Sequence, residues 1–211
     1  HSCPTRRSSD LHGDEVDVLL RRSDIAMYEA KQQTRPWATY SAGRDESYLH
    51  RLSLLADLRR AISEDQIVVH YQPKASIEDG AVASLEALAR WQHPRLGLIS
   101  PDEFIPLAEQ SGNIGALTEC VLIQVIRQLN SWRIDGIEPS VSVNLSALDL
   151  LNAELPVKLS RWLEEQGVAP EKLMLEITES AIMRDTSYSI NVLNRLRQCG
   201  VRLSIDDFGT G

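Results

Sequence analysis

The pattern of apolar and polar positions changes near Ile67. Before this residue, apolar side chains recur at helical spacing over Val16–Gln33 and Arg44–Glu64, and a connector at Thr34–Gly43 separates the two segments. After Ile67, short apolar runs alternate with longer segments of helical periodicity. Strands that alternate with helices are typical of an α/β fold with a mainly parallel sheet.

The second part of the chain is predicted to contain five strands and four helices. The strands are Ile67–Tyr71, which we expect Pro73 to end, Val82–Leu88, Val141–Leu145, Leu173–Ile177 and Arg202–Ile205. The helices are Pro101–Gln110, Leu117–Trp132, Pro156–Gln166 and Ser187–Cys199. Gly167 and Gly200 fall where helix C-termini are expected, because glycine tolerates the left-handed conformation found there.

Four of the predicted strands carry an oxygen-bearing side chain late in the strand or directly after it. These side chains are Glu86, Asn144, Glu176 and the pair Asp206 and Asp207. A barrel of parallel strands ringed by helices places its chemistry at the carboxyl ends of the strands, so we expect one shared site. A ligand set of carboxylates and an amide, without His or Cys, favours Mg²⁺ or Mn²⁺ over zinc. Two such ions about 3.5–4 Å apart can clamp a phosphodiester.

Each of these residues also has a simpler explanation when it is taken alone. Glu86 could be a surface carboxylate, Asn144 could cap the next segment, and Asp206 with Asp207 could form a turn. The recurrence at four successive strands favours the shared site. His70 and His93 are expected to be structural, since the oxygen ligands already suit a hard cation.

Composition limits the classes of partner. The 211 residues have a net charge of -8, which argues against binding of a nucleic acid polymer over a broad surface. A small anionic ligand stays compatible with this charge, because bound cations invert the local field. The sequence has no apolar stretch of about 20 residues and no signal-peptide pattern. We therefore expect a cytoplasmic protein, attached to a membrane only through other parts of a parent protein.

A series of longer motifs surrounds the candidate ligands. Glu86-Ala87-Leu88 is followed by Arg90. The other motifs, in chain order, are Tyr71-Gln72-Pro73-Lys74, Arg90-Trp91-Gln92-His93-Pro94, Phe104-Ile105-Pro106-Leu107-Ala108-Glu109, Ser142-Val143-Asn144-Leu145-Ser146, Leu175-Glu176-Ile177-Thr178-Glu179-Ser180 and Asp206-Asp207-Phe208-Gly209-Thr210-Gly211. From Ile67 to Gly211, this ordered set resembles the EAL-domain phosphodiesterases, which hydrolyse cyclic di-GMP.

The resemblance implies a fold, a reaction and a role for each candidate residue. The implied fold is a (β/α)8 TIM-type barrel, truncated here after about the fifth strand. The implied reaction opens cyclic di-GMP to linear pGpG. The resemblance implies that two ions of Mg²⁺ or Mn²⁺ are bound by Glu86, Asn144, Glu176, Asp206 and Asp207. Of these ligands, Glu86, Asp206 and Asp207 are also implied to be catalytic. Arg90 is implied to hold a substrate phosphate, Gln72 and Leu88 to line the substrate pocket, and Glu179 to position the loop that begins at Phe208.

The segment before Ile67 has a resemblance of its own. Leu19–Lys31 is similar to the last helix of a GGDEF (diguanylate cyclase) domain. The expected organisation is a non-native tail at 1–11, a GGDEF remnant at 12–43, a linker helix at 44–66 and the N-terminal part of an EAL domain at 67–211. The family also uses a lysine and two acids from later strands, so we expect this fragment alone to be inactive.

The sequence is compatible with three functions. The first is a metal-dependent phosphodiesterase, favoured because every ligand of the covered region is retained. The second is a receptor that binds cyclic di-GMP without cleaving it. The third is an interaction module, and in any of the three a homodimer through the EAL domain is expected.

Overall fold

The computed structural model of the chain describes residues 15–32, 35–41, 45–178 and 186–206. The chain divides into two compact units, residues 1–56 and 57–211. The first unit contains helix α2 (Val16–Gln32) and the beginning of helix α3 (Asp45–Ser63). Both helices were predicted to within one residue at each end. Their apolar spacing is sufficient to define them.

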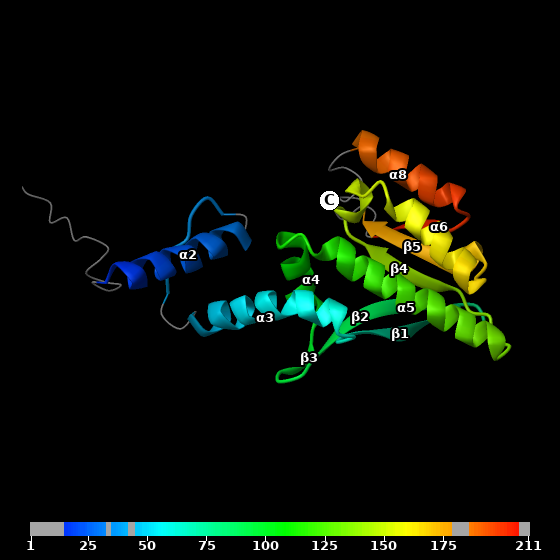
Figure 1. Cartoon of the computed structure of the whole chain (residues 1–211), viewed down its shortest axis with the longest axis horizontal. Helices are drawn as coiled ribbons and strands as arrows, with labels where there is room; N and C mark the ends of the chain where they lie inside the picture. The colour runs from blue at the N-terminus through cyan, green and yellow to red at the C-terminus, as the bar shows by residue number, and fades with distance from the viewer. Residues whose placement is uncertain (1–14, 33–34, 42–44, 179–185, 207–211) are drawn as a thin grey trace, which may run out of the picture. The chain divides into compact units, whose positions relative to one another are not determined.

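The described part of the second unit contains a six-stranded sheet (Figure 1). The strands are β1 (Ile67–Ala75), β2 (Val82–His93), β3 (Gly97–Ile99), β4 (Val141–Leu145), β5 (Leu173–Thr178) and β6 (Arg202–Asp206). The order is β1-β2-β4-β5-β6, with β3 paired to β2. The pairs β2–β4, β4–β5 and β5–β6 are parallel, whereas β1 and β3 run antiparallel to β2. The prediction of an α/β fold is confirmed, but the sheet is mixed, because β1 and β3 run antiparallel to β2 and so depart from the all-parallel pattern of a simple (β/α)8 barrel.

Two strand boundaries were predicted wrongly. β1 does not end at Pro73 but continues to Ala75. Proline is tolerated there because β1 is an edge strand in the described sheet, so the missing N–H removes no required hydrogen bond. β2 extends beyond Leu88 to His93, since it keeps pairing with β1 and then with β3. β3 itself was missed, because three residues are too few to show a strand pattern.

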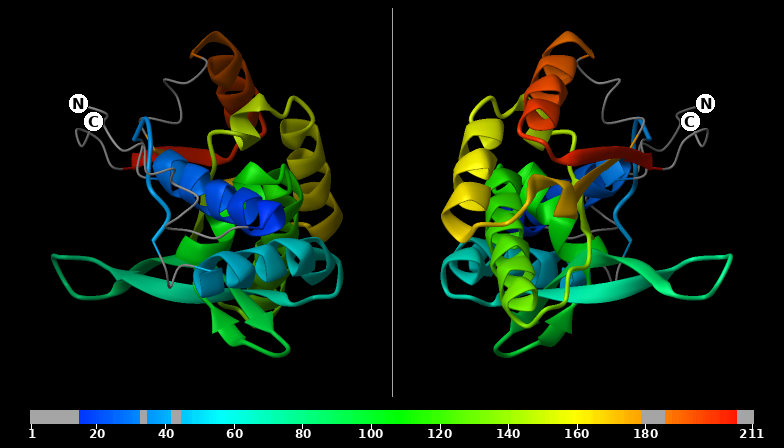
Figure 2. Two further views of the ribbon diagram at one scale, coloured as in Figure 1. Left: turned by 90° about the vertical axis from the view of Figure 1, so that its left-hand side faces the viewer. Right: turned by 90° about the vertical axis from the view of Figure 1, so that its right-hand side faces the viewer.

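In the described residues, four α-helices and two short 3₁₀ helices accompany the sheet. They are α4 (Pro101–Gln110), α5 (Ile114–Ile134), η1 (Asp149–Leu151), α6 (Leu155–Gln166), η2 (Pro170–Lys172) and α8 (Thr186–Gln198). In Figure 2, α5 and α6 lie along one side of the sheet. None of the helices in the described ranges is long and apolar enough to cross a bilayer.

The core lies between this helical layer and one face of the sheet. Val143 and Leu175 are buried on the central strands, and α5 buries the apolar stripe that includes Leu122 and Val125. Burial of such side chains contributes about 1.5–3 kcal/mol each relative to exposure. The stripe on α5 is therefore core, as its periodicity indicates.

His93 is part of this core, as predicted. Its Nε2 lies 3.1 Å from Oδ2 of Asp57 in the second half of α3. Its Nδ1 accepts hydrogen bonds from the backbone N–H groups of Arg95 and Leu96 at 3.2 and 3.1 Å. The hydrogen bond from His93 is the main cause that lowers the pKa of Asp57 below its ordinary value. Both ring nitrogens are committed, so His93 holds the β2–β3 turn against α3.

Gly200 connects α8 to β6, the strand that carries Asp206. Its φ is +89°, and a Cβ at this position would lie 3.1 Å from Cβ of Pro170. We expect Gly200→Ala to lower the free energy of unfolding by about 1–2 kcal/mol, because a side chain is strained in the left-handed region. Urea denaturation followed by circular dichroism measures this change.

Gly115→Ala provides the matched control for this prediction. Gly115 lies in the first turn of α5, and a Cβ there meets nothing within 4 Å. Alanine favours the helix over glycine, so the control should be neutral or stabilising by about 0.5–1 kcal/mol. Equal losses in the two variants would contradict the account of the α8–β6 turn.

Candidate metal and substrate site

The candidate ligands share the face of the sheet opposite the helices. Side chains alternate between the two faces of a strand, and residues paired in register point to the same face. Asn144 on β4 pairs with Glu176 on β5, and Thr178 on β5 pairs with Asp206 on β6. The alternate positions, such as Val143 and Leu175, are buried against the helices. The alternation therefore separates an apolar core face from a polar face.

Lys74 connects three strands on this polar face. Its Nζ lies 2.7 Å from Oε1 of Glu176 and 3.3 Å from Oε2 of Glu86. It also donates a hydrogen bond of 3.1 Å to Oγ of Ser142. Partial burial lowers the pKa of Lys74, but the hydrogen bonds and negative charges of Glu176 and Glu86 outweigh this effect, and the pKa is raised overall. The ammonium group thus compensates the charge of two predicted metal ligands.

Asn144 and Glu86 are also in direct contact. Nδ2 of Asn144 donates a hydrogen bond of 3.0 Å to Oε1 of Glu86. The structure therefore brings together three of the predicted ligands, which are Glu86, Asn144 and Glu176. They come from three different strands, which crossover connections join because parallel strands cannot be linked by a tight hairpin.

Glu176 is the most deeply buried of these ligands, with a relative exposure of 8%. Its Oε2 is buried and has no hydrogen-bond partner among the described residues. An unpartnered buried carboxylate oxygen is costly, and a bound cation would satisfy it. The oxygen-only ligand set and this unsatisfied atom fit a hard divalent cation such as Mg²⁺ or Mn²⁺.

Of the two remaining predicted ligands, Asp206 and Asp207, the structure describes only Asp206. Asp206 is exposed at the end of β6, on the same face as Thr178 and Glu176. Asp207 and Glu179 lie outside the described residues. Within the described ranges, no group of three or more His, Cys, Asp or Glu side chains has the spacing of a metal site. Lys74, rather than a third carboxylate, contacts Glu86 and Glu176.

The predicted substrate-binding residues lie on β1 and β2. Gln72 pairs directly with Glu86, so its side chain belongs to the same face. Arg90 lies four residues after Glu86 on the same strand and therefore shares that face as well. Its guanidinium donates a hydrogen bond of 2.9 Å to the carbonyl oxygen of Ala89. No carboxylate in the described part of the chain is within ion-pair distance of Arg90, which leaves its charge available for an anion.

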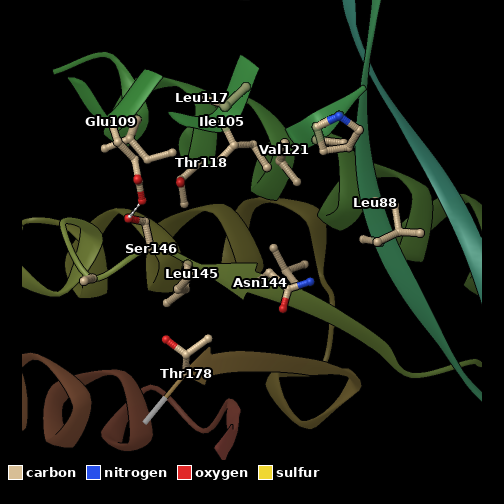
Figure 3. A pocket seen from close by; sticks show the side chains of 16 residues that line it. Leu88, Ile105, Glu109, Leu117, Thr118, Val121, Asn144, Leu145, Ser146 and Thr178 are labelled. Carbon is tan, nitrogen blue, oxygen red and sulfur yellow. Dashed lines mark hydrogen bonds between the residues drawn. The ribbon is translucent and has the colours of Figure 1, made fainter. Parts of the chain in front are cut away.

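A pocket of about 580 Å³ lies beside the polar face, between the middle of β2, the carboxyl end of β4 and helices α4 and α5 (Figure 3). Its lining includes Leu88 and Asn144 together with apolar side chains of α4 and α5, such as Ile105 and Val121. A volume of this size is typical of small-molecule sites. Leu88 lines this pocket, whereas Gln72 and Arg90 are not among its lining residues.

A buried hydrogen-bond network fixes the loop that follows β4. Ser146 Oγ donates to Oε1 of Glu109 at 2.5 Å, a contact that Figure 3 shows at the edge of the pocket. Oδ2 of Asp149 accepts hydrogen bonds from Thr118 Oγ1 at 2.8 Å and from the backbone N–H of Ser146 at 2.9 Å. The loop directly after Asn144 is therefore held by side chains of α4, α5 and η1.

The buried carboxyl group of Asp149 has an unusual pKa. Burial raises this pKa from 3.8 to about 6, although the hydrogen bonds from Thr118 and Ser146 act in the opposite direction. Neither Asp149 nor Lys74 was assigned a role from the sequence. Lys74 lies in the motif Tyr71-Gln72-Pro73-Lys74, two residues after Gln72, and this spacing places both side chains on one face of a strand. No sequence signal distinguishes Asp149 from an ordinary loop aspartate.

Comparison with known proteins identifies the family of the chain. Residues 55–211 match the EAL domain family. The chain belongs to the EAL-domain family. Over 202 residues it is 42% identical to the bifunctional diguanylate cyclase/cyclic di-GMP phosphodiesterase MucR of Pseudomonas aeruginosa, and this match covers 94% of the chain and 29% of MucR. It is 38% identical over 204 residues to the cyclic di-GMP phosphodiesterase PdeR of Escherichia coli, covering 96% of the chain and 31% of PdeR.

Solved EAL domains have the same fold. A structure of the MucR phosphodiesterase in complex with cyclic di-GMP superimposes with a TM-score of 0.71 at 44% sequence identity, covering 75% of this chain and 65% of that structure. The chain spans less than a third of the length of MucR and PdeR. The α/β fold and the family are therefore shown.

Asp149 gives a testable pH dependence. Its folded-state pKa of about 6 is above its ordinary value of 3.8, so the folded protein binds more protons than the unfolded chain between these values. Stability from this group is fully present below pH 3.8 and is lost as the pH rises to 6, by up to about 3 kcal/mol. Asp149→Asn removes the titrating group, so we expect the variant to gain stability relative to wild type by this amount between pH 4 and pH 7.

Urea denaturation at a series of pH values measures the difference between variant and wild type. Asp135→Asn is the control, because Asp135 is an exposed residue at the C-terminus of α5. The control difference should not change with pH. A difference for Asp149→Asn that is equally constant would show that this carboxyl group titrates normally in the folded protein.

Proposed function

We propose that the protein containing this chain hydrolyses cyclic di-GMP to linear pGpG in a reaction that depends on Mg²⁺ or Mn²⁺. The observation that carries the proposal is the convergence of Glu86, Asn144 and Glu176 on the polar face, with a buried oxygen of Glu176 left unsatisfied. The names of MucR and PdeR, both cyclic di-GMP phosphodiesterases, support the choice of substrate.

Each residue has a defined task in this proposal. Glu86, Asn144, Glu176 and Asp206 would hold the cations, together with Asp207. Bound divalent cations supply charge stabilisation at phosphorus and lower the pKa of a nucleophilic water. Glu86, Asp206 and Asp207 would be catalytic because their negative charge would hold the cations beside the reacting phosphate, and Glu179 would position the loop that begins at Phe208.

Arg90 and the pocket would orient the substrate. A guanidinium group matches the geometry of a phosphate and binds it through two parallel hydrogen bonds. Arg90 lies on the same strand and face as Glu86, so a phosphate held there would be close to the cation ligands. Gln72 would contact the substrate from β1, and Leu88 contributes an apolar wall.

We also propose how this chain is placed in a longer protein. The match to MucR covers 94% of the chain, so it includes residues before the EAL domain, and MucR is described as having a cyclase as well as a phosphodiesterase. This supports a GGDEF remnant at 12–43 and a linker helix at 44–66. Homodimer formation through the EAL domain and a cytoplasmic location stay predictions.

The substitution Glu176→Gln tests the proposed reaction. It keeps the shape of the side chain but removes the charge that would bind a cation. We expect the turnover of cyclic di-GMP to fall at least about 100-fold, which is typical when one electrostatic stabiliser is lost. The measurement is chromatography of cyclic di-GMP and pGpG after incubation with Mg²⁺ or Mn²⁺, using the protein that contains this chain.

Glu171→Gln is the matched control, because Glu171 is an exposed carboxylate just before β5. Its turnover should equal that of wild type. Tight binding of cyclic di-GMP by wild type without any turnover would instead identify a receptor. Neither binding nor turnover would leave only the interaction module.

A further inference from the structure

We propose that Lys74 is a positioning residue of the cation site, and that it holds Glu176 so that one carboxylate oxygen faces the cation. This inference rests on the metal-dependent function proposed above. It concerns a residue on β1, the antiparallel edge strand, which contributes none of the predicted metal ligands. The ammonium group of Lys74 makes three contacts on the polar face.

The contacts of Lys74 account for all its hydrogen-bonding capacity. A lysine ammonium has three N–H donors. Three acceptors surround this one, at 2.7 Å for Glu176, 3.1 Å for Ser142 and 3.3 Å for Glu86. These acceptors lie on β5, β4 and β2, so one side chain links three neighbouring strands. The direction of Lys74 is therefore fixed by the sheet.

As a result, the two carboxylate oxygens of Glu176 have different environments. Oε1 accepts the 2.7 Å hydrogen bond from Lys74, while Oε2 is buried without a partner in the described part of the chain. A carboxylate held by one oxygen cannot rotate freely, so the other oxygen keeps a constant direction. Carboxylates that bind metals are commonly held by such outer hydrogen bonds, and the loss of these bonds typically weakens metal affinity 10- to 100-fold.

The charge of Lys74 also permits Glu86 and Glu176 to approach each other. Two carboxylates that share one partly buried face repel one another. Lys74 lies between them and contacts both. An opposite reading treats the ammonium as a competitor that a divalent cation must displace. The two readings predict opposite changes in cation affinity when Lys74 is replaced, because removal of a competitor tightens cation binding and removal of a positioning group weakens it.

The deciding experiment is a titration with Mn²⁺ alone, without cyclic di-GMP, followed by the electron paramagnetic resonance signal of free Mn²⁺. Lys74→Met removes the ammonium but keeps an apolar stem of similar length. We expect Mn²⁺ binding to weaken about 10- to 100-fold. Affinity equal to or tighter than that of wild type would overturn the positioning role.

Lys158→Met is the matched control. Lys158 has a similar side-chain exposure (32% against 38% for Lys74) and also forms a 2.7 Å ion pair, with Glu119. It lies on α6, away from the polar face. Its replacement removes an equivalent ion pair, so a general loss of lysine charge or stability would affect both variants. The Mn²⁺ affinity of the control should match that of wild type.

A second variant keeps the inference testable if Lys74→Met fails to fold. Ser142→Ala removes one acceptor of Lys74 without touching a predicted ligand or a charge. We expect Mn²⁺ binding to weaken about 2- to 10-fold, the effect of one hydrogen bond. Unchanged affinity in Ser142→Ala would then overturn the inference. Absence of Mn²⁺ binding in wild type itself would overturn both the proposed function and this inference, whereas binding that is insensitive to Lys74 would overturn only the latter.

Discussion

The parallel register of β2, β4, β5 and β6 is the constraint on which the rest of the structure depends. Apolar side chains such as Val143 and Leu175 are buried against the helices, and this burial fixes which residues face the other side. A slip of one residue would exchange the two faces of a strand, placing a carboxylate such as Glu176 in the core. The hydrophobic core therefore determines where the polar face lies and which side chains meet on it.

This arrangement brings negative charges close together on the polar face, and a nearby side chain of the same sheet balances them. Acidic side chains brought together on a partly buried face need positive charge nearby. In the described structure Lys74 supplies that charge for Glu86 and Glu176. A divalent cation would supply more positive charge than Lys74 does. The buried Oε2 of Glu176 has no hydrogen-bond partner among the described residues, so it marks the place where such a cation would be bound. The adjacent loop is fixed separately, by the hydrogen bonds of Asp149 and Glu109.

Much of the fold was predictable because each central strand is a short apolar run between turn residues, and β4 was predicted without error. The extension of β1 through Pro73 and the short β3 were not, since both depend on neighbours that a local pattern does not reveal. The grouping of Glu86, Asn144 and Glu176 followed from their recurrence in successive predicted strands, although Glu86 lies in the middle of β2 and not late in it, because β2 continues to His93. The role of Lys74 did not, because it comes from an antiparallel strand whose direction the sequence pattern did not indicate.

The central claim is that side chains from separate strands form one cation site on the polar face. Anomalous diffraction from crystals of the protein grown with Mn²⁺ tests it most directly. The account predicts an anomalous peak within coordination distance of Oε2 of Glu176, with Asn144 and Glu86 beside it. Ordered side chains on this face without any peak, in crystals where Mn²⁺ is present, would contradict it.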